Sequence, residues 1–349
     1  MNPQSAALLL PLLNALDILE FAARHLDPSM LEALNEAVAP RAEKFRAAHA
    51  QSAGAPDWMK LAGDETLAAF DELGAAFAHG DLRATYKALR HAPRAQEALY
   101  LHAASYPAIN RFFVDHALRD NAEVLARCAQ QKHDGETGVL HFENDTGARG
   151  GFSLYVPEYY TPDRKWPLVI ALHGGSGHGR GFLWSWLRDA RSYGAILMSP
   201  TSTGPTWALL GDDTDTPNIN RMIEAVQSRW SIDPARILMT GMSDGGTFCY
   251  VSGLDAASRA THLGPVSAAF HPMLASMADA DRLRGLPIFM AHGALDWMFP
   301  VELAQQAQQY LTASGADVIY REIDDLSHTY PREINAPMLA WLRGVDASD

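Results

Sequence analysis

Hydrophobic and polar positions follow two different periods along this chain of 349 residues. Up to about residue 130, apolar residues return every three or four positions, beginning with the leucines at 9, 12, 13, 16 and 19. That spacing places apolar side chains on one face of an α-helix. Beyond residue 135 it gives way to short apolar runs that alternate with helical segments. The pattern therefore predicts a helical part followed by a part built from strands and helices.

The N-terminal part, residues 1–130, is predicted to be an all-helical domain with its own core. After the leucine stripe, helices are expected at residues 29–49, 64–78, 81–91, 94–104 and 109–129. The first helix is apolar enough to need a second surface, either the rest of the chain or a second copy, so a homo-oligomer through these helices is expected. The histidines here form no H-x-x-x-H pair beside an acid, and we interpret them as surface or hydrogen-bonded side chains: His25, His49, His79, His91, His102 and His116.

The C-terminal part, residues 131–349, is predicted to be an α/β domain, joined to the first by a polar linker at 131–135. Strands are expected at residues 139–142, 152–156, 166–172, 195–199, 236–240, 265–270, 287–292 and 318–323. Helices are expected at residues 181–193, 218–230, 247–254, 301–314 and 334–343. This alternation favours a mostly parallel sheet flanked by helices on both faces.

Composition narrows the possible partners. The formal net charge of −13 makes nucleic acid and anionic membranes poor partners. No apolar run is long enough to span a bilayer, and no basic residue precedes the first apolar run, as a signal peptide would require. The two cysteines, Cys128 and Cys249, cannot form a disulfide framework or a C-x-x-C metal site. We therefore expect a cytoplasmic protein.

Four stretches that follow predicted strands carry candidate chemistry. Gly241-Met242-Ser243-Asp244-Gly245 lies between a strand and a helix, as a G-x-S-x-G nucleophile elbow does. The glycine-rich turn at 173–177 can aim backbone N–H groups at a developing negative charge. Asp296 and His328 each follow a later strand, so the order is serine, acid, histidine. Taken singly, these residues could be a turn serine, a helix cap and a surface histidine, but the α/β-hydrolase triad has the same order.

From about residue 139 to 342 the chain resembles the α/β-hydrolase superfamily, and within it the phospholipase/carboxylesterase or feruloyl-esterase-like group. The helical part is not covered by this resemblance. At Asp244 the chain departs from relatives that often carry Gln or Ala. The resemblance is carried by Leu172-His173-Gly174-Gly175, by residues 231–237 and 241–246, by His292-Gly293 with Asp296 and Pro300, and by His328.

This resemblance implies a serine carboxylic ester hydrolase that acts on a small-molecule ester through an acyl-enzyme. Ser243 would be the nucleophile, His328 the base and Asp296 the group that orients His328, with Asp324 or Asp325 as an alternative acid. The backbone N–H groups of Gly175 and Asp244 would form the oxyanion hole, with Ser176 as a substitute for Gly175. No metal or organic cofactor is implied. Candidate substrate-binding residues are Trp184, Trp207, Trp297 and Phe299.

Three alternatives remain open at this level. A thioesterase or lysophospholipase would use the same serine, histidine and aspartate, and so would a feruloyl-type esterase. A protein of a different class, an interaction protein, would instead use the helical part as its working surface.

Overall fold

The computed structural model describes residues 3–130 and 135–345, and the side chains of the first helix from residue 7 onward. It divides into two compact units, Met1–Gln130 and Gln131–Asp349. Of the predicted linker at 131–135, only Gly135 lies within the described residues. We refer to the two units as the helical unit and the α/β unit.

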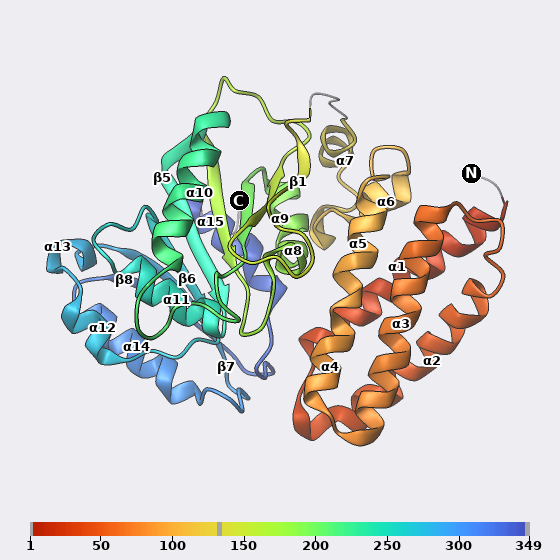
Figure 1. Ribbon diagram of the computed structural model, residues 1–349, viewed down its shortest axis with the longest axis horizontal. Helices are drawn as coiled ribbons and strands as arrows, with labels where there is room; N and C mark the ends of the chain where they lie inside the picture. Colours follow the sequence, from red (N-terminus) through yellow and green to blue (C-terminus); the bar gives the residue numbers. More distant parts are fainter. Residues whose placement is uncertain (1–2, 131–134, 346–349) are drawn as a thin grey trace. The chain divides into compact units, whose positions relative to one another are not determined.

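The helical unit contains only helices and 3₁₀ turns in its described residues, as the apolar periodicity predicted. Helices α1, α2, α3 and α5 pack alongside one another and bury Leu12, Leu16 and Leu19 of the predicted stripe (Figure 1). The elements are α1 (Pro3–Arg24), η1 (Pro28–Met30), α2 (Leu31–His49), α3 (Asp57–His79), α4 (Leu82–Leu89), α5 (His91–Tyr100), α6 (Pro107–Phe112), η2 (His116–Leu118) and α7 (Ala122–Cys128).

The single helix expected at 109–129 is wrong, because the chain breaks it into α6, η2 and α7. The Asp115 side chain accepts a hydrogen bond from the Ala117 N–H at 2.7 Å and so caps η2. The Asn121 side chain accepts from the N–H groups of Glu123 and Val124, both at 3.1 Å, and caps α7. Side chains of this type favour helix starts over helix interiors, because they satisfy the N–H groups that lack a partner in the first turn.

The α/β unit is built on one eight-stranded sheet in the order β1-β2-β4-β3-β5-β6-β7-β8 (Figure 1). Strands β1 and β2 are antiparallel to their neighbours, and the pairs from β4 to β8 are parallel, which confirms the predicted mostly parallel sheet. The strands are β1 (Gly138–Phe142), β2 (Phe152–Val156), β3 (Trp166–Leu172), β4 (Ile196–Pro200), β5 (Ile232–Met242), β6 (His262–Val266), β7 (Pro287–Gly293) and β8 (Asp317–Ile323).

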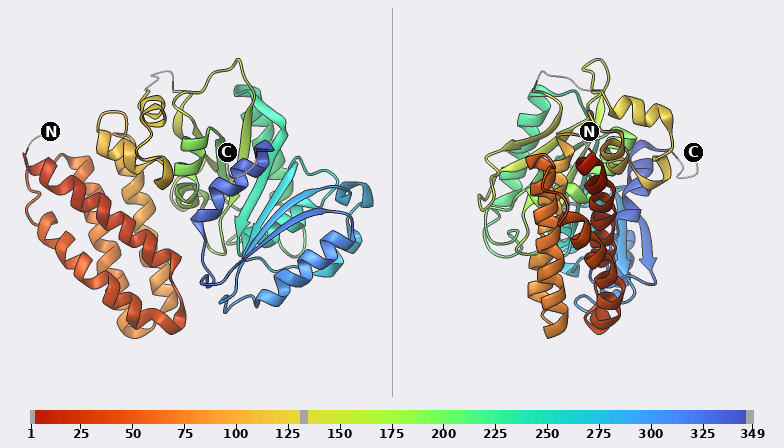
Figure 2. Two further views of the ribbon diagram at one scale, coloured as in Figure 1. Left: turned by 180° about the vertical axis from the view of Figure 1, so that it is seen from behind. Right: turned by 90° about the vertical axis from the view of Figure 1, so that its right-hand side faces the viewer.

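Helices cover both faces of this sheet. Helices α10 and α11 lie on the face toward the viewer in Figure 1, and α15 lies on the opposite face, seen from behind in Figure 2 (left). Strand β3 is buried along its whole length, as expected for a central strand covered on both sides. The helices are α8 (Gly179–Phe182), α9 (Leu187–Tyr193), α10 (Asp215–Arg229), α11 (Asp244–Gly253), α12 (Pro272–Met277), α13 (Ala280–Leu283), α14 (Val301–Ala313) and α15 (Asn335–Arg343), with 3₁₀ turns η3 (Leu183–Ser185) and η4 (Arg332–Ile334).

Strand β6 lies earlier in the chain than the predicted strand at 265–270. It ends at Val266, because Ser267 has a positive φ of 45° and the chain turns out of the sheet there. The following residues form a loop and then α12, which the apolar pattern did not predict. No helix within residues 3–130 and 135–345 combines the length and the apolar character needed to cross a bilayer.

Candidate active site

Ser243 occupies a sharp turn between β5 and α11, with φ 56° and ψ −121°. The turn is held by hydrogen bonds from the Ser243 N–H to the Val266 carbonyl (3.0 Å) and from the Thr247 N–H to the Ser243 carbonyl (2.8 Å). Its flanking glycines are required by close packing: a Cβ on Gly241 would lie 2.7 Å from the Gly245 backbone, and one on Gly245 would lie 2.5 Å from the Leu172 carbonyl oxygen. The strand–turn–helix context predicted for this serine is therefore present.

Three side chains from distant parts of the chain form one line of hydrogen bonds beside this turn. His328 follows β8, and its Nε2 lies 3.0 Å from the Ser243 Oγ. The His328 Nδ1 lies 2.8 Å from Oδ2 and 3.0 Å from Oδ1 of Asp296, which follows β7. A carboxylate only accepts hydrogen bonds, so Nδ1 carries the proton and Nε2 is left to accept one from the serine hydroxyl. Asp324 and Asp325, the alternative acids, are exposed.

The Asp296 carboxylate is held from several sides. Its Oδ1 accepts the backbone N–H groups of Met298 (3.0 Å) and Phe299 (2.8 Å). Burial alone raises the pKa of this carboxyl, but the His328 hydrogen bond, the Phe299 N–H and the electrostatic attraction of the His328 and His292 rings outweigh burial and hold the pKa below its ordinary value. Asp296 is therefore an ionised hydrogen-bond acceptor at neutral pH.

His292 is a residue whose contact with the acid the sequence analysis did not anticipate. Its Nε2 lies 2.8 Å from the Phe299 carbonyl oxygen, to which it donates, and 3.5 Å from Asp296 Oδ2. It is 1% exposed. The motif His292-Gly293 marked the strand end, but nothing local indicated that this ring would contact Asp296.

The glycine-rich turn after β3 passes directly beside Ser243. A Cβ on Gly174 would lie 3.7 Å from the Ser243 Cβ, and one on Gly175 would lie only 2.7 Å from Asp244 Oδ2. Asp244 is the first residue of α11, where backbone N–H groups have no acceptor within the helix. The Asp244 side chain is fixed by the Thr206 hydroxyl, which donates to Oδ2 at 2.5 Å.

Arg149, from the loop between β1 and β2, ties this turn to the loop after β4. Its Nη1 donates to the Gly177 carbonyl at 2.7 Å, and its Nε donates to the Gly204 carbonyl at 2.9 Å. Its Nη2 contacts the Ser202 hydroxyl as well. Sequence reasoning missed both Arg149 and Thr206, because neither lies in a recognisable motif and both act through contacts across the fold.

The predicted aromatic residues divide into two pairs. The Phe299 and Trp297 rings stand edge-on to His328, with centroids 5.2 Å and 6.3 Å from the imidazole, and Trp297 is 44% exposed. Trp207 is buried; its indole N–H donates to the His173 carbonyl at 2.7 Å and its ring stacks on Phe248. Trp184 is buried in η3. Burial leaves these last two indoles little surface for a substrate.

Comparison with known proteins finds similar sequences among esterases. Residues 212–342 match the family described as phospholipase/carboxylesterase. Among curated proteins, a bifunctional acetylxylan esterase/xylanase from Neocallimastix patriciarum is 25% identical over 162 residues, which is 45% of this chain and 23% of that protein. The Probable feruloyl esterase C of Aspergillus terreus is 30% identical over 115 residues, which is 31% of this chain and 42% of that protein. The matched region thus spans less than half of each relative.

Among solved structures, a truncated carbohydrate esterase from gut microbiota superposes with a TM-score of 0.50 and 12% identity, covering 63% of this chain and 100% of that chain. At this identity the likeness concerns the fold alone. Together with the sheet order, it shows that residues 131–349 have the α/β-hydrolase fold, and residues 212–342 within them match the phospholipase/carboxylesterase family.

Proposed function

We propose that this protein is a serine carboxylic ester hydrolase with Ser243 as nucleophile, His328 as general base and Asp296 as the residue that orients the base. The observation that carries the proposal is the unbroken line from Asp296 through His328 to Ser243, with contacts of 2.8 Å and 3.0 Å. Each contact joins groups of the required type, and the first fixes the tautomer that the second needs.

In the proposed reaction, the Ser243 hydroxyl attacks the ester carbonyl while its proton moves to His328 Nε2. The backbone N–H groups of Gly175 and Asp244 stabilise the oxyanion, because both belong to segments that lie against the serine. The imidazolium, stabilised by Asp296, then gives the proton to the leaving alcohol. Water hydrolyses the acyl-enzyme by the same route, and Ser243 regains its proton.

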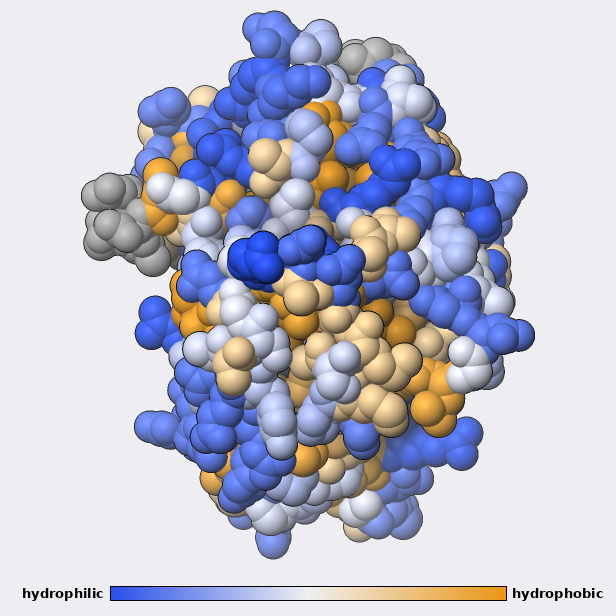
Figure 3. All heavy atoms as spheres, turned by 90° about the vertical axis from the view of Figure 1, so that its left-hand side faces the viewer, coloured by the Kyte–Doolittle hydropathy of each residue, from blue (hydrophilic) through white to orange (hydrophobic). Residues whose placement is uncertain are grey.

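The surroundings of Ser243 favour esters without a negative charge. The Asp244 carboxylate lies beside Gly175 of the glycine-rich turn and is fixed there by Thr206, so an anionic group on the substrate would be repelled. The loop after β7 adds exposed apolar side chains at Leu295, Trp297 and Met298. Helix α12 exposes Met273 and Met277, and Figure 3 shows apolar side chains gathered on the face where this helix lies. The Asp244 carboxylate and the exposed apolar side chains of the loop after β7, which contacts His328 through Trp297, suit a neutral ester with an apolar or aromatic part.

The names of two relatives support the same substrate class, because acetylxylan esterase and feruloyl esterase both refer to esters of a neutral acyl group. We therefore infer that the substrates are esters of small acids, either acetic acid or an aromatic acid. A thioesterase or lysophospholipase would share the chemistry but not this substrate preference.

Labelling with a fluorophosphonate probe tests the nucleophile. The wild type is expected to be labelled once per chain, and Ser243→Ala to lose both labelling and several orders of magnitude in ester hydrolysis. Ser267→Ala is a matched control, because Ser267 is also a buried serine with positive φ near this turn and its hydroxyl has no partner among the described residues. A folded wild type that resists the probe would favour the interaction-protein alternative.

Substrate class needs a second assay. p-Nitrophenyl esters of increasing acyl length, methyl ferulate, an acyl-thioester and a lysophospholipid would be compared by kcat/KM. We expect acetyl or feruloyl esters to give the highest value. Preference for the lysophospholipid or the thioester would leave the triad assignment intact and overturn the inferred substrate.

A further inference from the structure

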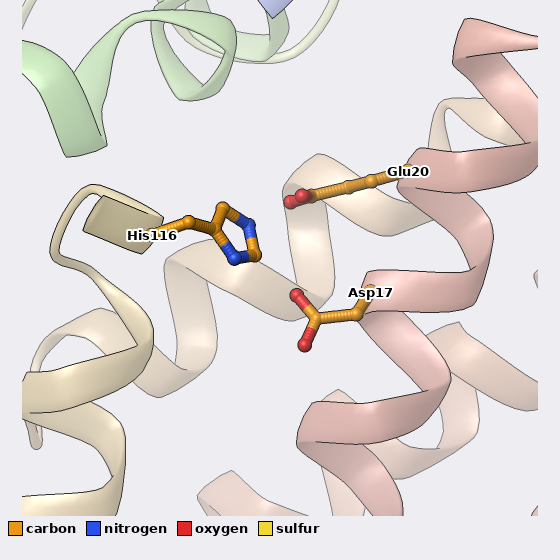
Figure 4. A group of neighbouring side chains, drawn as sticks. All are labelled: Asp17, Glu20 and His116. Atoms are coloured by element: carbon orange, nitrogen blue, oxygen red, sulfur yellow. The ribbon is translucent and has the colours of Figure 1, made fainter. Parts of the chain in front are cut away.

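A histidine and two carboxylates converge in the helical unit, far in sequence from any proposed catalytic residue. Asp17 and Glu20 project from α1, and His116 comes from the turn η2 (Figure 4). One ligand atom from each residue lies within 4.8 Å of the others. We propose that these three side chains form a site for a divalent transition-metal ion with the ligand preferences of zinc.

The fold brings these groups together for identifiable reasons. Asp17 and Glu20 are three residues apart on α1, so they share one face of the helix. His116 reaches that face because the chain breaks after α6, where Asp115 caps η2. In Figure 4 the imidazole points toward the ends of both acidic side chains. His116 therefore owes its position to the break between α6 and α7.

Each carboxylate is also oriented by a neighbour. Gln96, which is 2% exposed, donates from Nε2 to Glu20 Oε1 at 2.7 Å. Arg119 lies 3.6 Å from Asp17 Oδ1. The Arg119 contact is an ion pair, whereas the Gln96 contact is a hydrogen bond of the kind that carboxylates at metal sites usually accept.

The donor set selects a class of ion. One imidazole nitrogen and two carboxylate oxygens suit zinc and similar ions, whereas calcium and magnesium prefer oxygen ligands alone. Zinc bonds to these atoms are about 2.0–2.2 Å long, so ligand atoms in a tetrahedral site lie about 3.4 Å apart. His116 is exposed, so rotation of its side chain can bring its ring nitrogen closer to the two carboxylates. Water would complete the coordination, and the ion would tie α1 to η2.

A second histidine of the same unit provides a contrast. His91 Nδ1 lies 2.6 Å from Glu65 Oε2, and its Nε2 lies 3.4 Å from Glu72 Oε1. These acids meet opposite nitrogens of one ring, so the imidazole stands between them and no single ion can contact all three. His91 therefore stands between two acids without sharing an ion with both, which makes it a matched control for His116.

The test uses the full-length chain without a polyhistidine tag. Titration calorimetry with zinc chloride is expected to give one site per chain, and cobalt(II) bound in its place should give visible absorption. His116→Ala should weaken zinc binding at least tenfold, since even outer-contact substitutions cost 10–100-fold, and His91→Ala should leave it unchanged. Zinc should raise the melting temperature of the wild type and of His91→Ala but not of His116→Ala.

Asp17→Asn provides a second variant, which keeps the side-chain size and should weaken zinc to a similar degree. Zinc binding that survives both variants, or that magnesium or calcium displaces at equal concentration, would overturn the proposal. So would a wild type that binds no zinc while His116→Ala still alters its stability, because the three residues would then be an ion-pair cluster only.

Discussion

Replacing Asp296 by asparagine tests how the proposed triad is held. The change removes one charge and keeps the size of the side chain. Oδ1 accepts the N–H groups of Met298 and Phe299, so the amide oxygen of asparagine must take that position. The NH₂ group then occupies the place of Oδ2, which lies 2.8 Å from His328 Nδ1.

This orientation reverses the proton on the imidazole. An NH₂ group only donates, so Nδ1 must become an acceptor and the proton moves to Nε2, which faces the serine hydroxyl at 3.0 Å. A base that already carries its proton cannot take another. The tautomer switch in a serine protease triad lowers turnover about 10⁴-fold, which corresponds to about 5.4 kcal/mol in the activation free energy.

The assay is kcat for an acetyl ester between pH 7 and pH 9, with fluorophosphonate labelling measured alongside. Asp325→Asn and Asp324→Asn serve as controls, because both acids are exposed near His328 in sequence and should retain activity. Turnover of Asp296→Asn within about tenfold of wild type, with the fold intact, would refute the reasoning from tautomers. A large loss in Asp325→Asn alone would move the acid role to that residue.

Three further outcomes are expected. Because the folded-state pKa of Asp296 is lowered, its charge stabilises the fold above the unfolded-state pKa of about 3.9, and that stability is lost as pH falls through the lower folded-state pKa. The free energies of unfolding of wild type and Asp296→Asn, measured in urea, should therefore differ by a constant amount near neutrality and converge in acid. A difference that grows in acid would contradict this sign. Arg149→Ala should lower kcat more than it raises KM, since Arg149 holds the Gly177 carbonyl of the glycine-rich turn at 173–177. Arg149→Lys should recover only part of the lost activity, because lysine cannot contact both loops that Arg149 joins. Equal activity of all three proteins would exclude a positioning role. A fragment of residues 131–349 should fold and be labelled at Ser243, because the chain divides between residues 130 and 131 into two compact units. A folded fragment that the probe does not label would show that the helical unit completes the site.

Much of the fold could be predicted from the sequence, because its signals are local. Apolar runs such as 166–172 and the helical period up to residue 130 report which side chains must be buried, and burial decides the type of element. The G-x-S-x-G turn was also a local signal, since both glycines are required by packing against the neighbouring backbone. The positions of Asp296 and His328 after successive strands could be predicted because parallel strands end at one edge of the sheet.

The predicted element boundaries were wrong where local backbone or side-chain interactions outweighed the apolar period. Asp115 and Asn121 cap new helical turns and break the segment at 109–129. Ser267 ends β6 by its positive φ, which the apolar run through residue 270 does not reveal. Hydrogen bonds and backbone dihedral angles decide such points, and a hydrophobic pattern carries no information about them.

The contacts that hold the candidate sites were decided by the tertiary structure alone. Arg149 reaches Gly177 across two loops, and His292 reaches Asp296 because the loop after β7 folds back on its strand. In the helical unit, His116 meets Asp17 and Glu20 only after the helices have packed. Local sequence determines which residues can carry chemistry, whereas their meeting depends on packing between distant segments, which no local pattern along the chain encodes.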